Sequence, residues 1–215
     1  MKTILLYIVI TIAIIEAGYI YLFKYASIPN EHLQTLLPVA KPLQAYTFAN
    51  LRKAKFPPTD ISLGEEVSET ASSTARMFYF STPKTPNSTT TKKVSGLINI
   101  PKNPGIYPVI VMFRGFVPSD IYESGMGTQP SAALFSQQGF ITLAPDFLGY
   151  GESDKPSSDS FEDRCETYTT ALSLLSSLKT LNTQLQQKYK GTITADVNDV
   201  QLWGHSNGGH IALVA

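Results

Sequence analysis

The stretch QLWGHSNGGHIALVA, residues 201–215, joins a strand pattern to a helix pattern. Its apolar beginning predicts a buried strand, and the residues after Gly208 predict the start of a helix. Between them, Gly204-x-Ser206-x-Gly208 predicts a tight strand-to-helix turn that pushes the Ser206 hydroxyl out above a sheet. Ser206 is therefore the candidate nucleophile, and Gly204 and Gly208 leave room where strand and helix approach each other.

The same turn predicts half of an oxyanion hole. The backbone N–H of Asn207 follows the nucleophile at the positive end of the new helix, where a developing negative charge would be stabilised. In a sheet of this kind the second donor comes from the loop after an earlier buried strand. Here that loop is FRGFVP, residues 113–118, and the N–H of Phe116 is the candidate.

No residue close to Ser206 in the sequence completes a catalytic triad. His205 is expected to point to the other side of the sheet. His210 lies one turn into the same helix, which ties it too rigidly to reach the serine hydroxyl. Asp146 ends a predicted strand, and it is expected to organise the turn at residues 149–151 rather than to act in a triad.

The rest of the chain predicts a mixed, mostly parallel sheet flanked by helices, which is the α/β class. Continuous apolar runs predict strands that are buried on both faces, and a period of three to four residues predicts an amphipathic helix. The expected strands are 60–69, 75–82, 92–100, 107–113, 140–146 and 199–205, and the expected helices are 128–138 and 161–189. The long helix is expected to bury Phe161, Cys165, Tyr168, Leu172, Leu175, Leu178, Leu185 and Tyr189.

Three segments are expected along the chain. Residues 1–24 are apolar enough to predict a transmembrane helix, with a cleaved signal peptide as the alternative. Residues 25–58, with five prolines, are expected to form a stalk or lead-in, and residues 59–215 the N-terminal portion of a hydrolase domain. The expected location is therefore membrane-anchored with the hydrolase domain outside the cytoplasm, or secreted if the signal is cleaved.

Composition excludes several classes of function. Lysine plus arginine and aspartate plus glutamate both number 17, and the chain has no long basic run, so no nucleic-acid partner is expected. The single cysteine, Cys165, excludes an internal disulfide and a cysteine-based zinc site. We expect no metal.

Three motifs together carry a family resemblance. YPVIVMFRGF, GFITLAPDFLGYGESD and VQLWGHSNGGHIAL, in this order and spacing, resemble an α/β-hydrolase of the prolyl oligopeptidase or dipeptidyl aminopeptidase type. The dienelactone hydrolases and acyl esterases are similar as well. The resemblance covers residues 92–215. It implies the nucleophile Ser206, an oxyanion hole from Asn207 and the loop at Phe116, no cofactor, and an aspartate and then a histidine later in the chain.

The sequence departs from that pattern in three places. The chain stops at Ala215, so the acid and base are expected beyond it, and this fragment alone is expected to be inactive. No β-propeller-like domain precedes the hydrolase segment. Arg114-Gly115 replaces the usual His-Gly-Gly or Tyr-Gly-Gly. Arg114 is expected to pair with Asp120 or Asp146, and the alternatives are that it positions the loop or contacts a substrate carboxylate.

The resemblance predicts a serine hydrolase that cleaves a peptide bond, or an ester, through an acyl-enzyme on Ser206. A carboxylesterase or acyl esterase of the same fold is the alternative. Two other classes remain open: a non-catalytic, anchored binding protein with a hydrolase fold, and an anchored structural protein in which Gly-x-Ser-x-Gly is accidental.

Overall fold

The computed structural model describes residues 2–26 and 41–215, and the chain divides into two units, Met1–Lys41 and Pro42–Ala215. The first unit contains the helix α1 (Lys2–Ala26). Among the described residues no helix combines the length and hydropathy that crossing a membrane requires. The transmembrane helix predicted for residues 1–24 is therefore not supported. Of the predicted stalk, residues 27–40 lie outside the described part of the chain.

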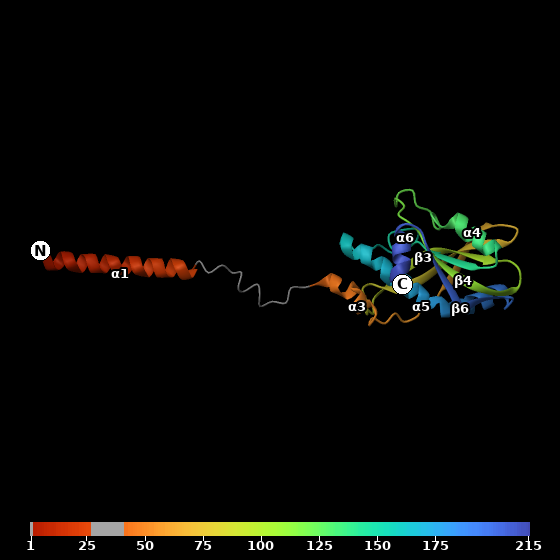
Figure 1. The fold of residues 1–215 in the computed structure, drawn as a ribbon, viewed down its shortest axis with the longest axis horizontal. Helices are drawn as coiled ribbons and strands as arrows, with labels where there is room; N and C mark the ends of the chain where they lie inside the picture. The colour runs from red at the N-terminus through yellow and green to blue at the C-terminus, as the bar shows by residue number, and fades with distance from the viewer. Residues whose placement is uncertain (1, 27–40) are drawn as a thin grey trace. The chain divides into compact units, whose positions relative to one another are not determined.

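The second unit contains one six-stranded sheet and its flanking helices (Figure 1). Its elements, in chain order, are η1 (Pro42–Tyr46), α3 (Phe48–Leu51), β1 (Ser62–Glu69), β2 (Ser73–Pro83), β3 (Thr91–Pro101), β4 (Gly105–Phe113), α4 (Gln129–Gln137), β5 (Ile141–Pro145), α5 (Ser160–Tyr189), β6 (Ile193–Gly204) and α6 (Asn207–Val214). Every predicted strand and helix of the hydrolase segment is present, with small shifts at the ends except for β6, which begins at Ile193 rather than at residue 199.

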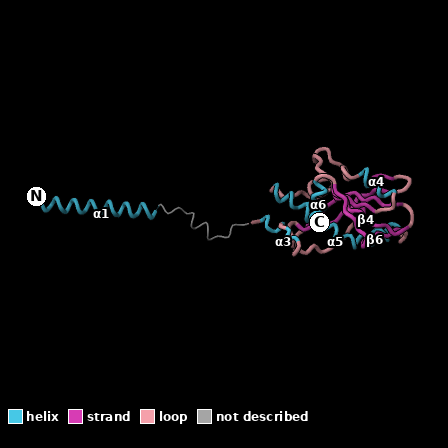
Figure 2. The backbone as a smooth tube through the Cα atoms, in the orientation of Figure 1, coloured by secondary structure: helices cyan, strands magenta, loops and turns pink. Residues whose placement is uncertain are grey.

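The sheet has the strand order β1-β2-β3-β5-β4-β6. Figure 2 shows the strands of this unit in magenta and its helices in cyan. The pairs β1–β2, β2–β3 and β3–β5 are antiparallel, whereas β4 pairs in parallel with both β5 and β6. The crossovers from β4 to β5 and from β5 to β6 run through α4 and α5, because a parallel pair cannot be joined by a tight hairpin. The predicted mixed α/β sheet is confirmed, but the expectation that it is mostly parallel is wrong, because three of its five strand pairs are antiparallel.

Strand β4 explains how the core has two layers. Its side chains alternate between the faces of the sheet, as the pleat requires. Val109, Val111 and Phe113 belong to the large core that also contains buried leucines of α5, whereas Ile110 and Met112 pack with residues of α4. Because both faces are covered, the strand is apolar at every position from 109 to 113, which is the pattern that predicted it.

The buried face of α5 differs from the predicted one. Leu178 and Leu185 are buried as expected, but Phe161 is 72% exposed, and the buried face of the first half carries small polar residues. Ser173 hydrogen bonds Thr82 of β2 at 3.1 Å, and such small hydroxyl side chains let the helix approach the sheet closely. A pattern of large apolar residues could not reveal this face, because small hydroxyl side chains occupy it. Ser173 and Ser177 hydrogen bond residues distant in sequence, whereas Thr169 donates to the carbonyl of Glu166 in the same helix.

The burial of strand β6 also differs from the prediction. The predicted run 199–205 reads as a strand buried on both faces, but residues 198–204 of β6 are mostly exposed. The reason is the topology, since β6 pairs only with β4 and forms an edge of the six-stranded sheet. A strand at an edge has neighbours on one side only, whatever its composition.

The segment before β1 packs against α5. Tyr46 and Leu51 are buried, and the Tyr46 hydroxyl donates to Glu162 at 3.2 Å. Ser176 donates to the backbone carbonyl of Phe56 at 2.5 Å. Residues 42–58 are therefore held to the helix that crosses one face of the sheet.

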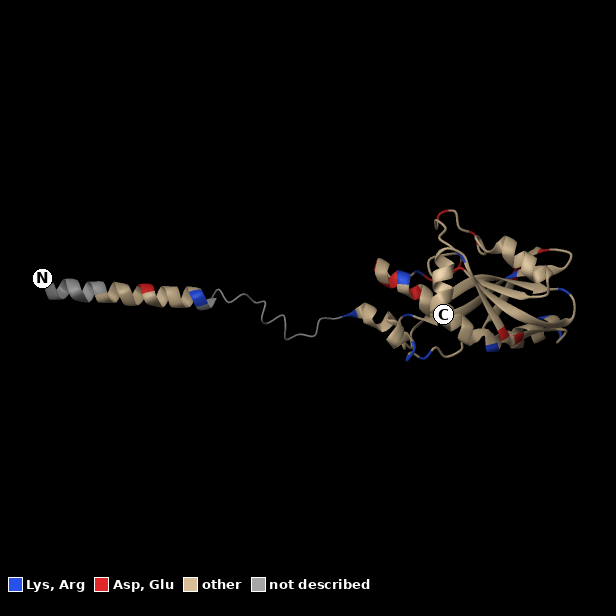
Figure 3. Ribbon diagram, viewed as in Figure 1, with Lys and Arg blue, Asp and Glu red and all other residues tan. Residues whose placement is uncertain are grey.

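Charges of both signs are spread over this unit (Figure 3). The full sequence contains 17 lysine plus arginine residues and 17 aspartate plus glutamate residues.

Candidate active site

The turn at Ser206 has the strained backbone that the motif predicts. Ser206 has φ 53° and ψ −118°, a conformation that residues with a side chain seldom adopt, and it is exposed between β6 and α6. The N–H groups of Gly208 and Gly209 donate to the carbonyls of His205 and Ser206 at 2.8 and 3.0 Å. Strain of this kind costs about 1–3 kcal/mol and is concentrated at functional sites.

The two elbow glycines are required by close backbone contacts. A Cβ on Gly208 would lie 1.8 Å from the carbonyl oxygen of Phe113, and one on Gly204 would lie 2.4 Å from that of Gly208. Both contacts are with backbone, which cannot move aside without separating β4, β6 and α6. The geometry therefore accounts for glycine at both positions.

The predicted oxyanion donors lie in the expected elements. Phe116 belongs to the loop after β4, and Asn207 is the first residue of α6. Neither backbone N–H has a hydrogen-bond acceptor within the part of the chain that the structure describes. The loop also reaches the elbow, because a Cβ on Gly115 would lie 3.3 Å from the Ser206 Cβ. Both donors are thus at the nucleophile's end of the sheet and available to a substrate oxygen.

Neither neighbouring histidine contacts the Ser206 hydroxyl, since the described residues form no hydrogen bond with it. His205 stacks beside Trp203 with ring centroids 6.5 Å apart. His210 lies edge-on to Tyr168, whose hydroxyl is 3.4 Å from Nδ1. The site as described contains a candidate nucleophile and candidate oxyanion donors but no general base.

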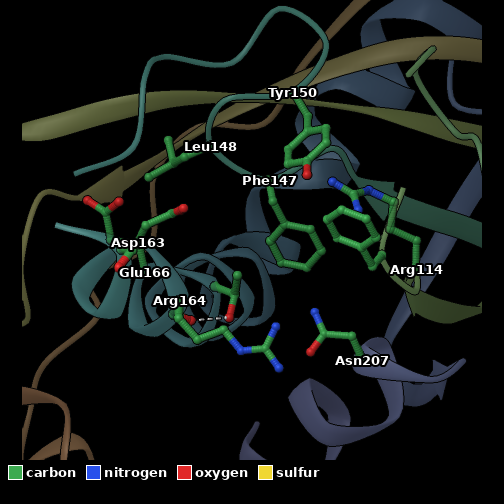
Figure 4. Close-up of a pocket in the computed structure, with 11 residues that line it drawn as sticks. Arg114, Phe147, Leu148, Tyr150, Asp163, Arg164, Glu166 and Asn207 are labelled. Atoms are coloured by element: carbon green, nitrogen blue, oxygen red, sulfur yellow. Dashed lines mark hydrogen bonds between the residues drawn. The ribbon is translucent and has the colours of Figure 1, made fainter. Parts of the chain in front are cut away.

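A cavity of about 210 Å³ opens beside these donors (Figure 4). Its walls come from the loops after β4 and β5, the first turns of α5 and the start of α6. The lining residues are Arg114, Phe116, Phe147, Leu148, Tyr150, Ser160, Asp163, Arg164, Glu166, Thr167 and Asn207. The carboxyl ends of β4, β5 and β6 meet here, which is where open α/β sheets bind their ligands.

The cavity has a mixed lining. Figure 4 shows the Phe147 ring between Arg114 and Leu148, with the Arg164 guanidinium and the Asn207 amide pointing toward one another below it. The side-chain Oδ1 of Asn207 is buried and accepts no hydrogen bond from the described residues. Burial and the nearby Glu166 carboxylate raise the pKa of Asp163 above its ordinary value. An apolar wall with a few polar groups is typical of small-molecule sites.

The surroundings of Arg114 differ from those predicted from the sequence. It is 5% exposed, and it forms no ion pair with Asp120 or Asp146, so the expected pairing is wrong. Its Nη1 donates to the carbonyl of Gly115 and its Nη2 to the backbone carbonyl of Asp146, both at 3.0 Å. Its Cζ lies 3.9 Å from the ring centroid of Tyr150, a short cation–π distance.

Asp146 is fully buried and accepts hydrogen bonds from three hydroxyl groups. Ser95 donates at 2.6 Å, Ser124 at 2.7 Å and Tyr122 at 2.8 Å. Burial and the adjacent carboxylate raise the pKa of Tyr122, so this phenol remains a neutral donor. The carboxylate also limits the turn that follows, because a Cβ on Gly151 would lie 2.2 Å from its Oδ2. The Asp146 carboxylate therefore links β3 to residues 122–124, and its hydrogen bonds do not go to the turn at residues 149–151 that it was predicted to organise.

Sequence reasoning missed the aromatic residues of the site. Phe147 has φ 70° and is almost fully buried, and its ring lies near that of Phe113 with centroids 6.1 Å apart. A bulky residue at positive φ is rare. Gly149 and Gly151 predicted a turn. They did not indicate that the rings of Phe147, Tyr122 and Tyr150 would surround Arg114.

The ion pair in the cavity wall supports a stability prediction. Glu166 is 2% exposed, and among the described residues its one cation partner is Lys92, whose Nζ lies 2.5 Å from Oε1. Lys92→Met should lower the free energy of unfolding by about 3–5 kcal/mol, because a buried carboxylate is left without its cation. Lys92→Met combined with Glu166→Gln should lose less, since no charge is then buried. Urea unfolding of the two variants checks this, and equal losses would contradict it.

The fold and sequence were compared with known proteins. A family model described as Chlorophyllase matches residues 67–215. No curated protein sequence matches the chain significantly. Among solved structures, the rice cell wall degrading esterase LipA from Xanthomonas oryzae is similar with a TM-score of 0.50, at 17% identity over 74% of this chain and 45% of that chain. Acetyl xylan esterase 1 from Thermoanaerobacterium has a TM-score of 0.48, at 17% identity over 82% and 54%.

The mixed sheet, the serine at a strand-to-helix elbow and the likeness to LipA define a protein with the α/β-hydrolase fold. The family match covers more than half of the residues, and the chain belongs to the chlorophyllase family. It spans about half the length of the similar structures, or 45% in the case of LipA. The predicted fold is confirmed, whereas the expected prolyl oligopeptidase type and its peptide substrates are not supported.

Among the described residues no group of three or more His, Cys, Asp or Glu side chains is arranged to hold a metal ion.

Proposed function

We propose that this chain carries the nucleophile and oxyanion hole of a serine hydrolase that cleaves carboxylic esters. The observation that carries the proposal is the backbone of Ser206, φ 53° at a strand-to-helix turn, in a member of the chlorophyllase family. This conformation costs free energy that a purely structural turn would have no reason to retain. Membership of this family favours the esterase alternative over peptide cleavage.

The proposed reaction proceeds through an acyl-enzyme. The Ser206 Oγ attacks the ester carbonyl carbon while a general base takes its proton, and the carbonyl oxygen becomes an oxyanion held by the N–H groups of Asn207 and Phe116. The alcohol leaves with the proton, and water then attacks the acyl group and releases the carboxylic acid and free Ser206. The base is expected to be a histidine later in the chain than Ser206, as the resemblance to α/β-hydrolases implies.

The test uses the full-length protein. A fluorophosphonate should label it covalently, and mass spectrometry should locate the adduct on the peptide that contains Ser206, because only an activated serine reacts fast. Heat-denatured protein, in which the elbow is lost, is the control. Labelling elsewhere, or equal labelling after denaturation, would refute the assigned nucleophile.

A substrate panel tests the bond that is cleaved. p-Nitrophenyl esters should be hydrolysed faster than matched p-nitroanilides by more than their difference in spontaneous reactivity. Because the family is named for chlorophyllase, chlorophyll belongs in the panel. Faster hydrolysis of the anilides would contradict the esterase proposal and favour a peptidase.

A further inference from the structure

Resting on the proposed function, we propose that Arg114 is a positioning residue for the oxyanion hole: its guanidinium orients the peptide group that presents the Phe116 N–H. The residue is buried directly after β4, and no carboxylate among the described residues forms an ion pair with it. Its Nε also has no hydrogen-bond partner in the described part of the chain. A buried charge is costly, so its retention requires a reason other than stability.

The first step is the geometry of one peptide group. The carbonyl of Gly115 and the N–H of Phe116 belong to the same peptide plane, and the structure contains no cis bond in its described residues. In a trans peptide these two groups point in opposite directions. Because Arg114 Nη1 donates to the Gly115 carbonyl at 3.0 Å, the Phe116 N–H must point away from the guanidinium. One side-chain hydrogen bond therefore sets the direction of the catalytic donor.

The guanidinium is itself held in place. Nη2 donates to the backbone carbonyl of Asp146 at 3.0 Å, so one planar group links the loops that follow two neighbouring parallel strands. The ring of Tyr122 lies 4.6 Å from Cζ and that of Tyr150 lies 3.9 Å from it. Two carbonyls and two aromatic faces determine both position and plane, which a lysine ammonium could not satisfy.

The loop is held on the other side of Phe116 as well. The Tyr150 hydroxyl donates to the carbonyl of Val117 at 3.1 Å, so the carbonyls before and after Phe116 are both bound by side chains. Phe116 itself is 76% exposed, and its side chain cannot anchor the loop. The hydrogen bond at the Gly115 carbonyl also polarises the peptide and makes its N–H a stronger donor.

The test is a comparison of kcat and KM for ester hydrolysis by the full-length protein. Arg114→Ala should lower kcat by about a hundredfold, as expected when an oxyanion donor is lost, while KM changes by less than about threefold. Added guanidinium ion, at concentrations well below those that unfold proteins, should restore at least about a tenth of the lost kcat by occupying the vacated site. Arg114→Lys should lower kcat by nearly as much, because one ammonium group cannot replace the planar guanidinium that donates to two carbonyls.

Arg76 supplies the matched control. It is also a buried arginine, with Nη2 donating to the carbonyl of Gly64 at 2.7 Å, but it lies on β2 away from the elbow. Arg76→Ala should lower stability and leave kcat near that of the wild type, without a response to guanidinium. If Arg114→Ala does not fold, folded Arg114→Lys decides the question.

The outcomes separate the two proposals. A folded Arg114→Lys with a kcat near the wild-type value, or Arg114→Ala whose loss lies in KM or is not relieved by guanidinium, would overturn the positioning role. A wild-type protein that neither hydrolyses esters nor reacts with a fluorophosphonate would instead overturn the proposed function, and the role of Arg114 with it.

Discussion

Gly208→Ala is expected to lower the free energy of unfolding by more than about 4 kcal/mol and to remove any activity of Ser206. The added Cβ would lie 1.8 Å from the carbonyl oxygen of Phe113 and 2.8 Å from that of Arg114. These atoms belong to the end of β4 and to the loop that presents the second oxyanion donor. The methyl group can be accommodated only if α6 moves away from the sheet, which separates Ser206 from that loop.

Gly209→Ala is the matched control for this prediction. It adds the same methyl group one residue further along α6, where the nearest atom is the Gly204 carbonyl oxygen at 3.6 Å. Alanine is a better helix former than glycine by about 1 kcal/mol, so this variant should be as stable as the wild type or slightly more stable. Urea or thermal unfolding distinguishes the two, and similar losses in both would contradict the assigned contact.

Ser206→Ala is expected to reduce kcat for ester hydrolysis by the full-length protein on the order of a million-fold, with little change in the melting temperature. The hydroxyl is exposed and forms no hydrogen bond with the described residues, so its loss removes the nucleophile without removing a structural contact. Steady-state kinetics and thermal unfolding of the purified variant measure the two effects. Activity within tenfold of the wild type would exclude Ser206 as the nucleophile.

Ser206→Gly separates catalysis from backbone strain. Glycine tolerates φ 53° and ψ −118° far better than serine or alanine, so Ser206→Gly should be as inactive as Ser206→Ala but more stable by about 1–3 kcal/mol. A gain in stability on removing a nucleophile is expected where strain is maintained for function. Equal stability of the two variants would mean that the turn is not strained.

Most of the fold could be predicted because its strands are local patterns. The run 107–113 is apolar at nearly every position because β4 is buried on both faces, so the apolar run directly reflects the burial of the strand. The face of α5 could not be predicted in this way. Its buried Ser173 and Ser177 hydrogen bond Thr82 and Thr59, partners that lie 91 and 118 residues away in the sequence.

The candidate site also has one part that could be predicted from the sequence and one part that could not. Gly204, Ser206 and Gly208 lie within five residues, and the geometry of a strand-to-helix turn is determined by residues that close together. Their roles could therefore be proposed from the motif, and the structure shows the strained serine and the close contacts of both glycines. The assignment of Phe116 and Asn207 as oxyanion donors stays a prediction.

The strands and helices, the elbow and the fold class could be predicted because apolar periodicity and glycine spacing act over a few residues. The position of Arg114 depends instead on long-range packing. Its partners are the loops after β4 and β5 and the rings of Tyr122 and Tyr150, which lie at the carboxyl ends of these two parallel strands. The sequence predicted a carboxylate partner for Arg114. In the structure the guanidinium is buried between two carbonyls and two aromatic rings, and hydrogen bonds rather than an ion pair hold it.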